Sequence, residues 1–137
     1  MTAIQIGDKI YASDPITGWG FYEKSQSILQ KSIENSDVVS ATIYASVPTF
    51  IDKESCLGIT PLFMMLQYSV VADFTPAIKV LVDKKIALKT SFDGFLKNLD
   101  LAKTYGISYV SGLLNKLKNS IGEEKYNQIM INKDYSH

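Results

Sequence analysis

The stretch LDLAKTYGISYVSGLL, from Leu99 to Leu114, decides the fold that the sequence predicts. Leu99 and Ala102 share one face of a first helix, which Gly106 ends. A second helix carries an apolar stripe formed by Val110, Leu113, Leu114 and Leu117. A hairpin of two such helices cannot bury its apolar face alone, so the pattern predicts that it stacks on a similar pair.

A second hairpin of this kind lies upstream, at a distance of roughly 33 residues plus a small insertion. Thr60 is a suitable N-cap, and Pro61 stands at the first helical position, where its missing N–H costs nothing. Thr75 and Pro76 repeat this arrangement at the start of the partner helix. The apolar positions of the two helices are Leu62, Met65, Leu66, Ile78, Leu81 and Val82.

The first part of the chain carries a weaker version of the pattern. Turn residues are dense from Asp14 to Gly20, and an amphipathic helix containing Leu29 and Ile33 is expected after them. Asn35, Ser36 and Asp37 are expected to supply the cap of the next helix. We expect residues 47–56 to project as a loop, and the aromatic cluster of Trp19, Phe21 and Tyr22 to cover the open end of the stack.

These residues resemble the ankyrin repeat, in which Thr-Pro-Leu opens an inner helix, a glycine ends it, and Val and then Leu-Leu lie on an outer helix. The matching residues of the second unit are Gly58, Thr60, Pro61, Leu62, Ile78, Leu81 and Val82. Those of the third unit are Leu99, Leu101, Ala102, Gly106, Val110, Leu113 and Leu114. The resemblance implies an all-α fold, an ankyrin-like stack of helical hairpins with projecting loops, and places both Leu101 and Leu113 in the stacking interface.

We expect a single domain over residues 1–137, with repeat units at 14–51, 52–89 and 90–121 and a C-terminal cap at 122–132 that rests Ile129 on the stack. This sequence departs from the ankyrin-repeat pattern at two places, and an irregular helical bundle is therefore the alternative to an ankyrin-like stack. Met65 and Leu66 stand where the family uses alanine, and Lys85 replaces the glycine that ends the outer helix. Lys84 and Lys85 are expected at a solvated helix end.

The composition excludes several classes of function. All 14 basic residues are lysines and balance 14 acidic residues, so the dense basic surface of a nucleic-acid binder is missing. The only imidazole is His137, and the single cysteine, Cys56, is expected to be an inert thiol. A histidine-centred triad or multi-histidine metal site therefore cannot be assembled. We expect no catalysis, no cofactor, no metal and no small-molecule substrate.

No apolar run approaches the roughly 20 residues of a membrane span, and the N-terminal residues lack the pattern of a signal peptide. We therefore expect a soluble, cytoplasmic chain, unless a leader peptide has been removed from it.

The resemblance implies a non-catalytic protein-protein interaction module. In proteins similar to ankyrin repeats, partners contact the projecting turns and the inner-helix surface. The corresponding positions here are Asp52, Lys53, Glu54, Tyr68, Phe92, Asp93, Thr104 and Tyr105.

The lysine- and isoleucine-rich composition without arginine also resembles products of low-GC bacterial genomes, where small ankyrin proteins accompany a toxin or effector as its immunity protein or inhibitor. Neutralisation of a cognate toxin or effector is therefore the expected function. The alternatives are a structural or assembly subunit that self-associates and, more weakly, an enzyme with an unrecognised carboxylate site.

Overall fold

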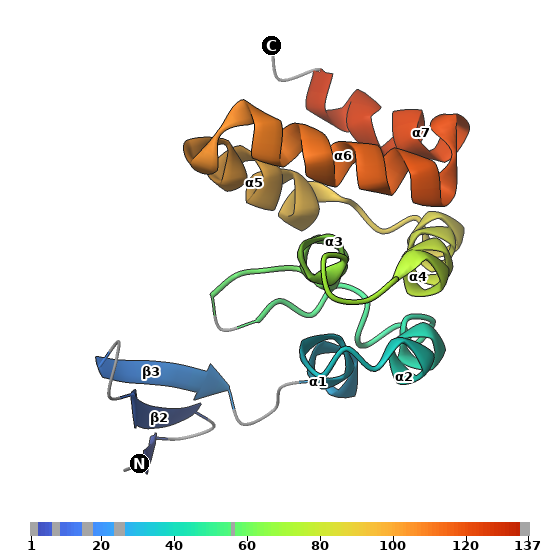
Figure 1. The fold of residues 1–137 in the computed structure, drawn as a ribbon. Helices are drawn as coiled ribbons and strands as arrows, with labels where there is room; N and C mark the ends of the chain where they lie inside the picture. The colour runs from blue at the N-terminus through green and yellow to red at the C-terminus, as the bar shows by residue number, and fades with distance from the viewer. Residues whose placement is uncertain (1–2, 7–8, 15–17, 24–26, 56, 135–137) are drawn as a thin grey trace.

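The protein is a stack of helical pairs preceded by a small sheet (Figure 1). A computed structural model describes residues 3–6, 9–14, 18–23, 27–55 and 57–134, and the side chains of residues 27–55 and 57–131. The first pair is α1 (Ile28–Glu34) and α2 (Val38–Tyr44), and the second is α3 (Pro61–Tyr68) and α4 (Thr75–Leu88). The third pair is α5 (Asp93–Ala102) and α6 (Ile107–Ile121), joined by the short 3-10 helix η1 (Lys103–Tyr105), and α7 (Glu123–Asp134) follows.

The pairs are arranged in two rows. Helices α1, α3 and α5 contact one another in sequence along one row, and α2, α4 and α6 do so along the other. Helix α7 packs on α6, and its residue Ile129 is fully buried. The helical class is therefore confirmed for the described residues from Ser27 onward.

The N-terminal strands were not predicted. They are β1 (Ala3–Ile6), β2 (Lys9–Asp14) and β3 (Gly18–Glu23), which form an antiparallel sheet in the order β1-β2-β3. Isoleucine and aromatic residues recur in these segments, and such residues favour strands. The first repeat unit required a helix directly after the turn residues from Asp14 to Gly20. The structure has β3 there instead. The side chains of Trp19, Phe21 and Tyr22 lie outside the described part, as does Cys56.

Two predicted helix starts are confirmed. The Asp37 carboxylate caps α2 by accepting a hydrogen bond from the Ser40 amide at 3.1 Å. Thr60 is the N-cap of α3, and Pro61 is its first residue. The Thr60 hydroxyl does not bond to its own helix, because it donates to Asn98 of α5 instead. This N-cap therefore links two helical pairs.

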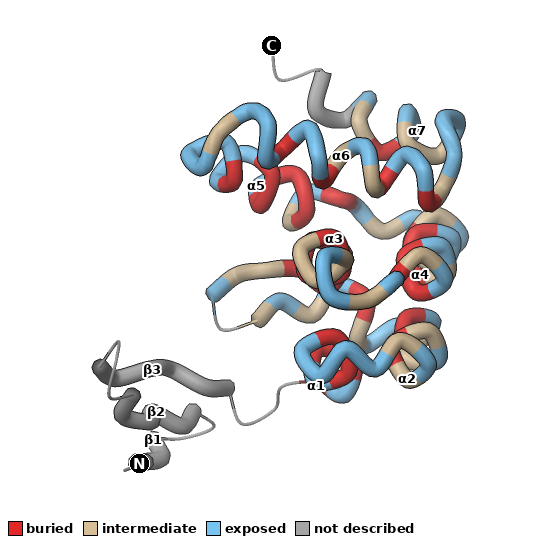
Figure 2. Tube along the Cα trace, in the orientation of Figure 1, coloured by how far each residue is buried: buried red, intermediate tan, exposed pale blue. Residues whose placement is uncertain are grey.

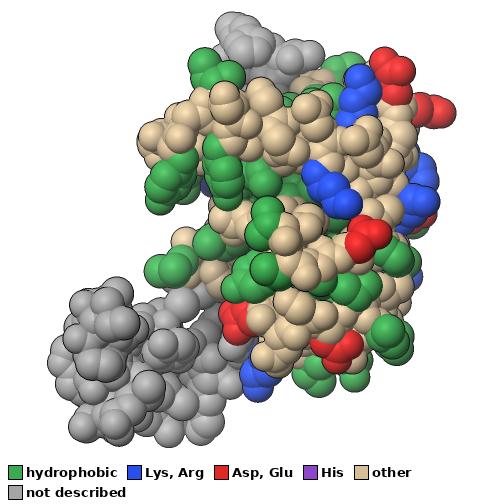
Figure 3. All heavy atoms as spheres, in the orientation of Figure 1, with side chains coloured by type: hydrophobic (Ala, Val, Ile, Leu, Met, Phe, Trp, Pro, Cys, Tyr) green, Lys and Arg blue, Asp and Glu red, His purple; other side chains and the backbone are tan. Residues whose placement is uncertain are grey.

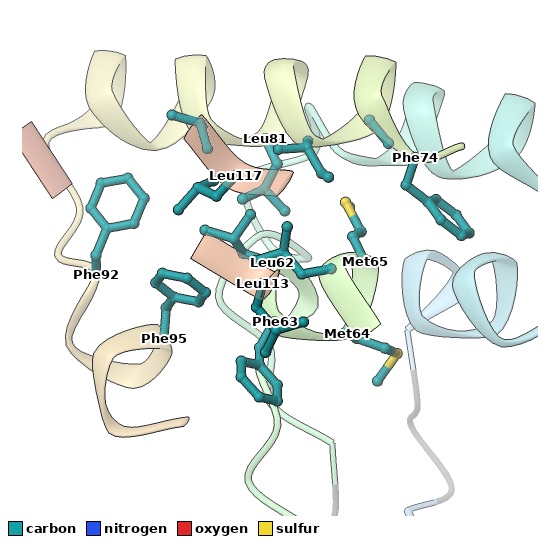
Figure 4. Close-up of a cluster of buried hydrophobic side chains, with 14 of the residues drawn as sticks. Leu62, Phe63, Met64, Met65, Phe74, Leu81, Phe92, Phe95, Leu113 and Leu117 are labelled. Carbon is teal, nitrogen blue, oxygen red and sulfur yellow. The ribbon is translucent and has the colours of Figure 1, made fainter. Parts of the chain in front are cut away.

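The core lies between the two rows, with α3 at its centre (Figures 2 and 4). Every residue from Pro61 to Leu66 is buried, because α1, α4, α5 and α6 all contact α3. A helix that is apolar on all sides requires such surroundings. This accounts for Met65 and Leu66, which fill space that alanine would leave empty.

The third pair crosses the second steeply. Figure 1 shows α1 to α3 nearly along their axes but α5 and α6 from the side. As a result, the C-terminal end of α5, η1 and the start of α6 extend past α3. Leu113 is buried as predicted, whereas Leu101 is 67% exposed, so its assignment to the stacking interface is wrong. The buried stripe of α5 runs through Phe95, Leu99 and Ala102, and Leu101 points away from it.

Two leucines of α5 provide a matched test of this packing. Leu99→Ala should lower the free energy of unfolding by about 2–5 kcal/mol, because Leu99 is fully buried. Leu101→Ala should change it by less than about 0.5 kcal/mol, because the side chain is exposed. Urea denaturation of both variants measures the difference. Equal losses would contradict the orientation of α5.

The start of α4 depends on Asp73 rather than on Thr75, which is itself the first helical residue. The amide and hydroxyl of Thr75 donate to the Asp73 carboxylate at 3.0 and 2.6 Å, and Lys116 of α6 donates to it at 3.3 Å. The hydrogen bonds from Thr75, followed by that from Lys116, lower the pKa of Asp73 from 3.8 to about 2. Lys116 thus ties α6 to the second pair.

The lowered pKa of Asp73 predicts an acid-dependent contribution to stability. A carboxylate with a depressed folded-state pKa stabilises the fold above its ordinary pKa, and this stabilisation disappears as the pH falls through the folded-state pKa. Asp73→Asn should therefore be less stable than the natural chain at about pH 5, and the difference should shrink as the pH approaches about 2. Urea denaturation across this range is the measurement. A difference independent of pH would contradict the cap.

Candidate functional site

A hollow lined by uncharged side chains lies where the third pair extends past α3. Its volume is about 200 Å³, and its lining consists of Leu57, Ile59, Phe63, Gln67, Asn98, Leu101, Ala102, Tyr105 and Tyr109. It continues along Gln67 and the two tyrosines into an open hollow of about 390 Å³. Figure 3 shows apolar side chains above and below this indentation on one side of the molecule. We call these lining residues the tyrosine groove.

The rims of the tyrosine groove expose large apolar side chains. Tyr105 is 82% exposed on η1, and Leu57 is 79% exposed on the loop that precedes α3. Leu101 of α5 is 67% exposed and also lines the hollow. A cluster of exposed apolar side chains around a hollow is typical of a binding surface.

The two tyrosines hold each other in place. Their rings meet edge to face, with centroids 6.2 Å apart and an interplanar angle of 67°. The Tyr109 hydroxyl accepts a hydrogen bond from the Gln67 side chain at 3.2 Å, which connects the pair to α3. Gly106, with φ of 121°, separates η1 from α6 and places both tyrosines on the same side. The aromatic wall is therefore fixed to two helices.

Asn98 fixes the opposite wall. Its side-chain oxygen accepts hydrogen bonds from the Thr60 amide at 2.9 Å and from the Thr60 hydroxyl at 2.8 Å. Its side-chain nitrogen donates to the Gly58 carbonyl at 3.0 Å. The hydroxyl of Ser55 also accepts from the Leu57 amide at 3.2 Å. The loop that carries Leu57 is thus bound to α5, which lines the same groove.

Among the described residues that line the tyrosine groove, none is charged. Asp100 of α5 and Lys103 of η1 are outside this lining and pair with each other at 3.4 Å. A charged group placed in this groove would lose hydration without gaining an opposite charge. The lining therefore favours an uncharged, apolar ligand surface.

The residues predicted to bind a partner do not lie together. Tyr105 lines the tyrosine groove, and the exposed Thr104 lies beside it on η1. Tyr68 is half-buried against the core. Asp52, Glu54 and Asp93 are exposed and Lys53 is half-buried, all on the loop before α3 or at the start of α5. Phe92 is buried, so its prediction as an exposed partner-binding ring is wrong.

Phe92 is buried because it packs beneath a buried lysine. The Lys85 ammonium lies 4.9 Å from the centre of the Phe92 ring and forms an ion pair with Asp52. Lys85 does lie in the last turn of α4, but the expectation that this lysine is solvated is wrong, because it is buried. These groups surround a second pocket of about 250 Å³, lined by Ile51, Asp52, Glu54, Thr60, Leu62, Lys85, Ser91, Gly94 and Phe95. Its buried charge is already paired within the chain.

Leu57, Leu101 and Tyr109 are groove residues that the sequence analysis did not assign to a site. Leu101 carried one signal, since it lies off the apolar stripe of its helix. Leu57 and Tyr109 carried no such signal in the sequence, because only the crossing of the third helical pair over the second brings them together.

Comparison with known proteins found no matching family model, no matching curated protein and no matching solved structure. Within the described residues, histidine, cysteine and acidic side chains form no group of three that could hold a metal ion. None of the helices in that part of the chain has both the length and the apolar character needed to cross a membrane.

Asn98→Ala tests how the groove wall is held. The substitution leaves the Thr60 amide and the Gly58 carbonyl without their partner, so it should lower the free energy of unfolding by about 2–3 kcal/mol. Amide hydrogen exchange should become faster at residues 57–60, in the loop before α3, and less so within α3 itself. Ser111→Ala, at an exposed position of α6, is the control. Unchanged exchange in the loop would contradict the bridging role of Asn98.

Proposed function

We propose that this chain is a non-catalytic protein-binding module whose tyrosine groove takes an uncharged, apolar segment of a partner protein. The observation that carries the proposal is the exposure of Tyr105, Leu57 and Leu101 around a preformed hollow. Exposed aromatic side chains on a rigid scaffold commonly supply most of the energy of a protein interface. The lining residues belong to helices α3, α5, η1 and α6 and to a loop that is hydrogen-bonded to α5. Binding a partner would therefore cost little conformational entropy in this chain.

An ankyrin-like architecture is part of the proposal. It is supported by the two rows of helices and by the Thr60-Pro61 start of α3. The steep crossing of the third pair makes it an irregular member of that architecture. In this arrangement the tyrosine groove lies along the row of α3 and α5, the row that corresponds to the inner helices on which partners of ankyrin-like proteins dock.

The proposed partner is a cognate bacterial toxin or effector, which the chain neutralises in the cytoplasm by steric occlusion. This step rests on the composition, with 14 basic residues that are all lysine, and on the ankyrin resemblance. Binding at an uncharged groove suits a specific protein surface and requires no reaction at this chain.

Site-specific crosslinking tests the proposal. A photoreactive phenylalanine analogue replaces Tyr105 in living source cells, and a matched variant carries it at Val39, which is 73% exposed on α2 in the other row. We expect one foreign protein to crosslink at position 105 and not at position 39.

The purified partner should then bind Tyr105→Ala at least about tenfold more weakly than the natural chain, which is the effect of losing one interface anchor. Circular dichroism checks the fold, and Val39→Ala should bind normally. Equal binding of the natural chain and Tyr105→Ala would contradict the proposal.

A further inference from the structure

We infer that the segment bound in the tyrosine groove is proline-rich and adopts the extended polyproline II conformation. The inference rests on the proposed function and deepens it, because it names the chemical class of the segment that this groove accepts. The hydrogen-bonding groups that line the groove, and those that it lacks, select this class.

The tyrosine groove has room for an extended segment. Leu57 and Ile59 line only the hollow of about 200 Å³, whereas Tyr105 and Tyr109 line both this hollow and the open one of about 390 Å³. The two hollows therefore meet at the tyrosines. An extended segment can place one side chain between the aliphatic residues and the next ones along the tyrosine rings.

The tyrosine rings present flat apolar surfaces that are inclined to each other. Their planes meet at 67°, and Tyr105 is 82% and Tyr109 39% exposed. Proline-rich segments dock in aromatic-lined grooves of this kind. Because none of the described lining residues is charged, the groove also suits a segment whose side chains carry no charge.

Both tyrosine hydroxyls are available to donate a hydrogen bond to a ligand. The Tyr109 oxygen accepts from the Gln67 side chain at 3.2 Å, which leaves the O–H of Tyr109 as a donor. The hydroxyl of Tyr105 makes no hydrogen bond within the described part of the chain. Two O–H donors beside apolar side chains favour a ligand with free carbonyl groups. A polyproline II segment has no internal hydrogen bonds, so all of its carbonyls are free.

Other conformations of an apolar segment match these groups less well. A helical segment uses its carbonyls internally, so it would cover the tyrosine hydroxyls without giving them an acceptor. A strand would bring a row of backbone N–H groups, but the lining residues lie in helices and a loop and offer no strand edge to pair with them. Proline has no N–H, so a proline-rich segment leaves few such groups unpaired. Its fixed φ also limits the conformational entropy that the segment loses on binding.

Titration of the isotope-labelled full chain with two peptides, followed by NMR, tests the inference. The first is a blocked, uncharged peptide of about nine residues with a Pro-Pro-Leu repeat, which spans about three turns of polyproline II. The second has alanine in place of each proline. The proline peptide should cause saturable shifts at residues 57–59 and 101–109 with a dissociation constant below about 300 μM, and the alanine peptide should bind at least about tenfold more weakly.

Two variants separate the hydroxyl from the ring. Tyr105→Phe keeps the exposed ring and removes the donor, so it should bind the proline peptide about threefold to tenfold more weakly. Tyr126→Phe removes the same atom from α7, outside the tyrosine groove, and should bind like the natural chain.

The inference is overturned if the proline peptide causes no saturable shifts up to about 1 mM, if both peptides bind equally, or if Tyr105→Phe binds like Tyr126→Phe. These results are separable from those of the crosslinking experiment. A foreign protein crosslinked at position 105 through a segment without proline would sustain the proposed function and overturn the inference. Selective binding of the proline peptide without any foreign crosslink would sustain the preference of the groove and count against the proposed function.

Discussion

The burial of every residue of α3 from Pro61 to Leu66 is the constraint on which the rest of the structure depends. A helix of eight residues, Pro61–Tyr68, has little stability of its own and persists because its neighbours enclose it. Helices α1 and α4 cover part of its surface, and both α5 and α6 must cover the remainder. The third pair does so by crossing α3 steeply, which carries η1 past the body of the stack. The tyrosine groove is thus a consequence of how the core is closed.

Polar contacts connect this core to the groove. Thr60 begins α3, yet its amide and hydroxyl both bond to Asn98 of α5, so the start of the central helix depends on the third pair. The same asparagine holds the Gly58 carbonyl. Because a buried amide side chain is costly when unpaired, these three bonds favour one relative position of α3, α5 and the loop. Asn98 therefore holds together two of the elements that line the groove, the loop before α3 and α5.

The sequence predicted local features well and tertiary ones poorly. Asp37, Pro61 and the stripe through Leu113 could be located because capping and helical periodicity depend on neighbouring residues alone. The exposure of Leu101 had a local signal, its position off the apolar stripe of α5, but the resemblance to ankyrin repeats placed it in the stacking interface. The burial of Lys85 was hidden, since its partner Asp52 lies in a loop 33 residues away along the chain. The N-terminal strands were missed because turn residues around Gly18 favoured a repeat unit.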